Sequence, residues 1–275
     1  MMTPRALAIA QTELLILRRN RWLFMATLIM VLFALALTFA GSAPTGSLGV
    51  DMLTISVASM TTLSVYLAPL LGLMMSFDAI SGDVDRGSLS LMLSYPPSRG
   101  EILLGKFLSH LAALSFAMII GFGTAGALAT WSGGAGSDSL LALARLIATS
   151  ILLGAVFLAL GYMVSAFAGS STAAAGMSAA LWLIFVVLFD LGLLGAVVMD
   201  QSGYFTQTIF PWVMVANPAD AFRVWNVAAS DAVALTSGMT GAASALPGWA
   251  APVSLLLWPI LGLALARIAF GRVEP

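Results

Sequence analysis

Seven charged residues lie within residues 76–108, although the whole chain has only 11 basic and 12 acidic residues. In this stretch the segment "GEILLGKF" (residues 100–107) has the G-x-x-x-x-G-K spacing of a phosphate-binding loop, which binds nucleotide phosphates. That loop requires Ser or Thr after the lysine to bind magnesium, and a strand before the first glycine. Here Phe107 follows the lysine and "YPPSR" precedes the glycine. We therefore expect no nucleotide site in this chain.

Cysteine and histidine, which often carry covalent, redox or metal chemistry, are almost absent. The chain has no cysteine and one histidine, His110. Disulfides, thiolate metal sites and nucleophilic thiols are therefore excluded, and so is a haem held by two histidines of one chain. We expect His110 to be a hydrogen-bonded structural residue, and the 15 methionines to face lipid or fill packing gaps. The sequence thus predicts no catalytic residue, no cofactor and no bound metal.

The charged stretch is typical of a surface that binds another protein. Asp83 is expected near the start of a short helix, where a negative charge interacts favourably with the helix dipole. Leu89, Met92 and Leu93 follow at i, i+3 and i+4, the spacing of an apolar set that enters a groove on a partner. An ordinary solvated loop with a few interfacial leucines explains the same pattern about equally well.

The composition indicates that most of the chain lies in lipid. Hydrophobic residues make up 60% of the chain and charged residues 8%, whereas typical soluble domains are about 25% charged. Long continuous apolar runs favour membrane helices over a barrel, whose strands alternate over about ten residues. A spanning helix needs about 20 mostly apolar residues. The sequence predicts an all-α membrane protein with six spans, at residues 22–40, 55–77, 107–131, 141–167, 172–188 and 249–270.

Arginine and lysine are distributed unevenly between the two sides of these spans. With both termini on one side, only Arg145 and Arg223 fall on the other. Cytoplasmic loops carry the excess of basic residues, so both termini and the loop 78–106 are predicted to be cytoplasmic. We expect one membrane domain, residues 1–275, with an amphipathic interfacial helix at 4–20 and a long outer segment at 199–247.

Asp190 lies where the fifth span should still be in lipid, and a carboxylate at the centre of a spanning helix costs about 3 kcal/mol. Gly192 and Gly195 interrupt the apolar run beyond it. Asp190 therefore either faces a partner or water, or the span ends there and residues 191–199 re-enter the outer leaflet. The two glycines favour the second alternative. Arg145 is the nearest predicted partner for this carboxylate, near the outer end of the fourth span.

Polar residues in two of the spans are candidates for a translocation path. Ser59 and Thr62 lie in the unusually polar first half of the second span, and Asp190 is a third candidate. The hydroxyl residues of the second span would line a route between two copies of the chain. Close packing of small-residue helices is a competing and compatible explanation for the hydroxyl side chains.

The segment "NPADAFR" in the outer region has a plain structural interpretation and a functional one. Asn217 and Pro218 form a turn, Asp220 lies in the first turn of the following helix, and Arg223 can pair with it at i+3. The functional interpretation is that this helix docks a partner on the outer side.

The loop sequence "DVDRGSLSLMLSYPPSRGEILLGK" resembles the first cytoplasmic loop of the ABC-2 permease family, and "ELLILRRNRW" resembles the family's amphipathic helix before span one. The resemblance covers nearly the whole chain. It implies a type V exporter-like permease domain in a bacterial inner membrane, a homodimer, and a cytosolic ATPase that binds the ATP. Residues 82–93 would form a coupling helix inserted into a cleft of that ATPase. The coupling residues would be Asp83, Asp85, Arg86, Gly87, Ser88, Leu89, Met92 and Leu93.

Within the family, "PPSRGEILLGKFL" together with "NPADAFRVWN" is similar to the permeases that serve the maturation of nitrous oxide reductase. This likeness implies a dimer that works with the ATPase and a periplasmic accessory protein to assemble a copper–sulfide centre, by exporting a sulfur species. Asn217, Asp220 and Arg223 would dock the periplasmic protein. Without cysteine the chain cannot carry sulfur covalently. Export of a lipid, polysaccharide or drug is the alternative.

Three other functions are weighed against the ATP-driven exporter. An ion-gradient-driven carrier needs paired charges near the middle of the membrane, and only Asp190 fits that description. A membrane enzyme or redox subunit needs clustered histidine, cysteine or carboxylate residues in its spans, and the sequence nearly excludes it. A passive anchor that only recruits other proteins does not need the polar second span.

Overall fold

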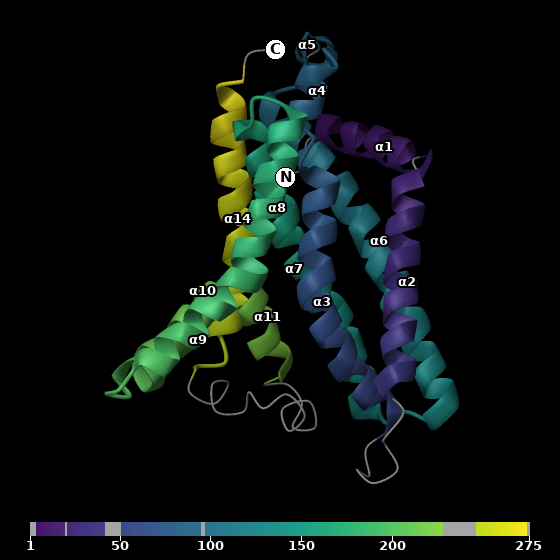
Figure 1. Ribbon diagram of the computed structural model, residues 1–275. Coiled ribbons are helices and arrows are strands. Elements are labelled where there is room, and N and C mark those ends of the chain that lie inside the picture. Colours follow the sequence, from purple (N-terminus) through teal and green to yellow (C-terminus); the bar gives the residue numbers. More distant parts are fainter. Residues whose placement is uncertain (1–3, 20, 42–50, 95–96, 228–245, 274–275) are drawn as a thin grey trace.

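The computed structural model describes residues 4–19, 21–41, 51–94, 97–227 and 246–273, and these are almost entirely helical (Figure 1). The part of the chain that it describes contains no strand, so the predicted all-α class is confirmed. In chain order the elements are α1 (Pro4–Arg19), α2 (Arg21–Gly41), α3 (Met52–Ser76), α4 (Ser81–Asp85), α5 (Ser88–Leu93), α6 (Arg99–Gly133), α7 (Ser137–Phe167), α8 (Ser171–Leu183), the π-helix η2 (Ile184–Leu188), α9 (Phe189–Met199), the π-helix η3 (Phe205–Ile209), α10 (Phe210–Ala216), α11 (Pro218–Val227) and α14 (Ala250–Gly271).

Five helical segments in these described ranges are long and apolar enough to cross a membrane. They are α3 with α4, α6, α7, the run α8–η2–α9, and α14. The bent pair α1–α2, with 68° between its halves, makes a sixth when it is counted as one span. α1, α4, α5 and the C-terminal end of α14 lie at one end of the bundle (Figure 1). We call this the cytoplasmic end, following the predicted orientation, and the opposite one the outer end.

The fifth span continues past Asp190, contrary to the expected re-entrant segment. α8, η2 and α9 form one helical run, Ser171–Met199. The prediction that residues 191–199 re-enter the outer leaflet is wrong. A helix that ended within lipid would leave backbone N–H and C=O groups without partners, which costs several kcal/mol, more than two helical glycines cost.

α3, α7 and α14 form the packed centre of the bundle, and glycines let α3 and α7 approach closely. A Cβ atom on Gly72 would lie 2.7 Å from the Gly154 carbonyl oxygen and 3.0 Å from the Leu158 nitrogen. Ser64 donates its hydroxyl to Ser150 Oγ at 2.7 Å across the same interface. Small residues and interhelical hydrogen bonds therefore hold this pair together. This is common in membranes, because the hydrophobic effect does not drive one apolar helix onto another when both are surrounded by lipid.

α1 packs one face on α6 and leaves another face exposed. Ala6 is buried, and a Cβ on Gly105 of α6 would lie 2.7 Å from Cγ2 of Ile9. Leu7 on the other face is 48% exposed. The predicted helix at 4–20 is thus present as Pro4–Arg19, with Asn20 outside the described residues. One packed face and one exposed apolar face suit a helix that lies at a membrane interface.

The outer segment turns back along α9 through η3 and α10, and α11 then packs on α14 and α7, while residues 228–245 lie outside the described part of the chain. The turn from α9 into η3 is closed by Asp200, whose carboxylate accepts the Thr206 N–H at 2.8 Å. Hydroxyl groups of Thr206 and Ser202 donate to the same carboxylate. These hydrogen bonds favour the ionised form and hold the pKa of Asp200 below its usual value.

Replacing Gly72 with alanine is expected to lower the free energy of unfolding by about 1–3 kcal/mol, because backbone atoms of α7 cannot move aside for the methyl group. Gly123→Ala on α6 is the matched control, since nothing lies within 4 Å of a Cβ there and alanine favours helix. Thermal unfolding of both variants in detergent measures the difference. Equal midpoints for G72A and the wild-type chain would contradict the close α3–α7 contact.

Candidate functional site

The loop between α3 and α6 contains two short helices, where a single coupling helix was predicted at residues 82–93. α4 ends at Asp85 and α5 begins at Ser88. Gly87 between them has a φ of 67°, a left-handed conformation that glycine adopts readily and that stops a helix. Ser98 and Glu101 then form a capping box that starts α6. The loop is therefore a folded element with defined corners.

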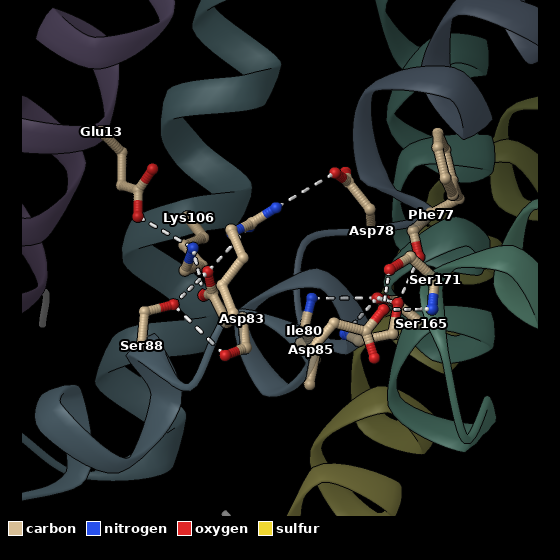
Figure 2. A network of polar contacts seen from close by, with 12 residues as sticks. Glu13, Phe77, Asp78, Ile80, Asp83, Asp85, Ser88, Lys106, Ser165 and Ser171 are labelled. Carbon is tan, nitrogen blue, oxygen red and sulfur yellow. Dashed lines mark hydrogen bonds and ion pairs between the residues drawn. The ribbon is translucent and has the colours of Figure 1, made fainter.

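Asp83, Lys106 and Glu13 form a buried ionic network at the base of this loop (Figure 2). Lys106 Nζ lies 2.8 Å from Asp83 Oδ2 and 2.9 Å from Glu13 Oε1. The three side chains are only 9%, 8% and 17% exposed in the order named. They come from α4, α6 and α1, so the network joins three helices. A buried charge without its partner is strongly destabilising, which ties the three positions to one another.

Asp83 also fixes the start of α5. Its Oδ1 accepts hydrogen bonds from Arg86 Nη2 at 3.1 Å and from the Ser88 hydroxyl at 3.0 Å. The sequence placed Asp83 near the start of a short helix, and it does lie in the first turn of α4. Its pairing with Lys106 was not anticipated, and Glu13 was not considered a site residue. A lone acid among the leucines and isoleucines of α1 was the one available signal.

The apolar residues predicted to enter a groove on a partner face the bundle. Leu89 is 1% exposed, and Met92 and Leu93 pack against the same buried cluster. The expectation that this set forms a docking face is wrong for Leu89, because burying its side chain anchors α5 on the helices beneath. Leu91 is 68% exposed and is the apolar side chain that α5 presents outward. Asp85, Arg86 and Gly87 are exposed as well.

Two further contacts join the loop to α7 and α8 (Figure 2). Ser165 Oγ of α7 accepts the N–H groups of Ile80 at 2.9 Å and Ser81 at 3.0 Å. Asp85 Oδ2, at the end of α4, accepts the backbone N–H of Ser171 at 2.9 Å and also its hydroxyl. Ser171 is the first residue of α8. A displacement of α4 therefore acts directly on α1, α6, α7 and α8.

A cavity of about 590 Å³ lies beside this network, between α1, the end of α3, α4–α5 and α6. Its apolar lining includes Met74 and Leu23, and its polar lining includes Lys106, Arg86 and Asp78. His110 also faces it, with Nδ1 hydrogen-bonded to the hydroxyl of Tyr162. Both of these rings are buried, so the prediction of a hydrogen-bonded structural histidine is confirmed.

A second ionic cluster lies on α9 and α11. Arg223 Nη1 is 2.6 Å from Asp190 Oδ2 and 2.7 Å from Asp220 Oδ1. The predicted i, i+3 pair of Asp220 and Arg223 is therefore confirmed. The prediction of Arg145 as the partner of Asp190 is wrong, because Arg145 donates to the Trp225 carbonyl oxygen at 3.1 Å. The folding of α11 back against the bundle brings Arg223 to Asp190, and no local pattern in the sequence encodes that contact.

Asn217 links the same cluster to the π-helix of the fifth span. Its Nδ2 donates to the Phe185 carbonyl oxygen at 2.8 Å and to Asp220 Oδ2 at 2.9 Å. Asn217 is 1% and Asp220 2% exposed, and the Arg223 side chain is 20% exposed. The expected docking of a periplasmic protein by these residues is corrected accordingly, since they are used inside the chain to hold α11 on the fifth span.

The candidate path residues are separated in the structure. Thr62 is exposed and Ser59 half-buried on α3, whereas Asp190 faces α11. A cavity of about 350 Å³ lies between α3 and α8, lined by Leu70, Trp182 and other apolar side chains. The buried Ser178 hydroxyl lines this cavity and, within the described residues, has no hydrogen-bond partner. Only Ser59 and Thr62 of the predicted path therefore share a surface.

Comparison with known proteins assigns the chain to a family. A family model described as ABC-2 family transporter protein matches residues 7–274. The chain belongs to the ABC-2 family. It is 40% identical to the probable ABC transporter permease protein NosY of Pseudomonas aeruginosa, over 98% of each chain. It is 37% identical to the protein of the same name from Stutzerimonas stutzeri, over 96% of this chain and 97% of that one.

Membership of the ABC-2 family confirms the resemblance carried by the loop and by the helix before span one. An ABC transporter permease is a multi-pass membrane subunit and not an enzyme, and the ATPase resides in a partner subunit. The nucleotide chemistry thus lies outside this chain.

Replacing Lys106 with methionine is expected to lower the free energy of unfolding by about 3–5 kcal/mol, because Asp83 and Glu13 would remain buried without a counter-charge. Arg86→Met is the matched control. The Arg86 side chain is 60% exposed, so its loss should cost about 1 kcal/mol or less. Thermal unfolding in detergent compares the two variants. A K106M protein as stable as R86M would show that the network does not hold the loop.

Proposed function

We propose that the chain is the permease of an ATP-driven exporter that works as a homodimer and moves a sulfur species across the bacterial inner membrane. The cargo would serve assembly of the copper–sulfide centre of nitrous oxide reductase. Family membership and the 40% identity to a NosY permease over 98% of both chains support this proposal. A periplasmic accessory protein is the expected third partner.

The folded loop with its exposed tip is the observation that carries the proposal. Leu91 projects from α5, while Leu89 on the same helix is buried and Asp83 beneath it is ion-paired. A partner that binds the tip therefore acts on α4, which is attached to α1, α6, α7 and α8. When two ATPase subunits close on ATP, they would displace α4. The spans would then switch between an arrangement open to the cytoplasm and one open to the outer side.

The fifth span supports a homodimer. Only 6% of the most apolar window of Ser171–Met199 is buried within the chain, against 28% to 56% for the other four spans. Its first half is rich in alanine, serine and glycine, which allow a second helix to approach closely. A partner copy packed here would also lie near the α3 face that carries Ser59 and Thr62. These two hydroxyls would then line a route at the dimer interface.

The proposed cargo must pass without a covalent carrier on this chain, because there is no cysteine. An ABC-2 exporter of a lipid, polysaccharide or drug would present the same loop, so the loop does not select among cargoes. The similarity to the NosY permeases favours a sulfur species as the cargo. For the accessory protein, the buried Asn217 and Asp220 do not offer a contact surface, so its docking site is proposed on exposed residues of the outer end.

A single cysteine at Leu91 is expected to crosslink to the partner ATPase, since Leu91 is the outward side chain of α5. The chain has no native cysteine, so L91C is the only thiol that this subunit contributes. Leu141→Cys is the matched control, because Leu141 is 71% exposed but lies at the opposite end of the bundle, near the start of α7. The complex is assembled, treated with a thiol-to-amine crosslinker and analysed by gel and mass spectrometry. An equal yield of ATPase adduct from L91C and L141C would overturn the assignment of the loop.

Deleting the gene in its host is expected to yield nitrous oxide reductase that lacks the sulfide of its copper centre. The measurement is acid-labile sulfide and copper per mole of the purified periplasmic enzyme. Complementation with the wild-type chain should restore both, and Leu91→Asp should not, because a carboxylate at the tip would weaken an apolar contact with the ATPase. A normal sulfide content in the deletion strain would refute the cargo while leaving the ATPase crosslink as a separate result.

A further inference from the structure

The geometry points to Asp85 as the residue that passes motion from the coupling loop to the fifth span, which makes Ser171–Met199 the moving helix of the permease. This inference rests on the proposed coupling to an ATPase and adds the route that the motion takes inside the chain. Asp85 acts through Ser171 and contacts no cargo, so it is a positioning residue.

The contact between Asp85 and Ser171 lies on the first turn of α8. Asp85 Oδ2 accepts both the N–H and the hydroxyl of Ser171, while the Ser170 hydroxyl oxygen accepts the N–H of Ala173. The N-terminus of a helix carries a partial positive charge, so a carboxylate there forms a charge-assisted link. Figure 2 shows Asp85 pointing from α4 toward Ser171. The end of the coupling helix is thus attached to the start of a spanning helix.

The same loop is attached to α7, but α7 is held far more firmly. Ser165 of α7 binds Ile80 and Ser81, and the residues before it, from Leu153 through Tyr162, are buried in succession. Moving α7 would disrupt its packing against α3 and α14. In the most apolar window of the fifth span only 6% is buried within the chain, against 44% for α7. A displacement of α4 is therefore transmitted more readily to the fifth span than to α7.

Among the described residues, three polar contacts hold the rest of the fifth span. Trp182 Nε1 donates to the Tyr66 carbonyl oxygen of α3 at 3.1 Å. Beyond it, Asn217 binds the Phe185 carbonyl oxygen in η2, and Arg223 binds Asp190. A π-helix within a spanning helix is a local irregularity where direction changes easily. The span is thus a lever that is driven at Ser171 and held near η2 by α11.

The test uses two single-cysteine reporters in the complete complex of permease and ATPase. One reporter is at Leu91 on the loop, 68% exposed, and the other is at Met199 at the far end of the span, 82% exposed. The rate of labelling by a maleimide is measured for each with and without a non-hydrolysable ATP analogue. Each reporter is placed in the wild-type background and in D85A, D85N and D78A. Asp78 is the matched control, because its side chain is 43% exposed and its pairing with Arg86 is 3.9 Å long.

We expect the nucleotide to change the labelling rate at both reporters in the wild-type and D78A complexes. In D85A the change at Leu91 should persist and the change at Met199 should be lost. D85N keeps an oxygen that accepts the Ser171 N–H but lacks the charge, so it should retain part of the response at Met199. The Leu91 reporter shows in every variant that the complex has assembled and that the loop follows the ATPase.

Two results would overturn the inference. Either Met199 responds to nucleotide as strongly in D85A as in the wild-type complex, or Met199 does not respond in the wild-type complex although Leu91 does. Failure of the proposed function gives a different result, in which Leu91 itself does not respond to nucleotide. The two failures are therefore separated by the loop reporter.

Discussion

The ion pairs that Lys106 forms with Asp83 and Glu13 are the constraint on which the arrangement of the cytoplasmic end depends. Three charges have been removed from water, and the loss of Lys106 would leave both carboxylates without this counter-charge. Because the three residues belong to α6, α4 and α1, this electrostatic requirement fixes the interfacial helix and the loop on the same spanning helix. The apolar anchor Leu89 then holds α5 on top of it. A loop fixed in this way transmits a force instead of absorbing it.

The contacts of the loop differ in how firmly their partners are packed. In the proposed coupling, this difference would direct a displacement of α4 toward the fifth span and not toward α7. The Lys106 network is buried, and the Ser165 contact leads to the deeply packed α7. The Asp85 contact leads to the span with the smallest buried share in its most apolar window, 6% in the single chain. In a homodimer the second copy would cover that span, so motion at α8 would also change the interface between copies. The fifth span would then both receive the motion of the ATPase and control the access of the cargo to the route between the two copies.

The sequence predicts the parts of this structure that depend on local pattern. Apolar runs predict the spans. The Ser98–Glu101 helix-start spacing and the helix-breaking Gly87 are also local signals, but they were not used, and a single helix was predicted over residues 82–93. The pairings of Lys106 with Glu13 and of Asp190 with Arg223 join residues that are far apart in the chain. No hydrophobic period or motif encodes such contacts. The burial of Leu89 was missed for a related reason, since i, i+3, i+4 spacing defines a face but not whether it meets the bundle or a partner.

The two ends of the fifth span are held by contacts of different kinds, which decides how the span can move. At Ser171 the link to Asp85 is exposed, so water can replace it transiently and it can form again as α4 shifts. At Asp190 the ion pair involves Arg223, which is largely buried and also bound to Asp220. Breaking that cluster would leave carboxylates with no counter-charge among packed helices. The span is therefore expected to turn about the α11 contact and not to slide past it, so that a shift of α4 at the cytoplasmic end becomes an opposite displacement of α9 at the outer end.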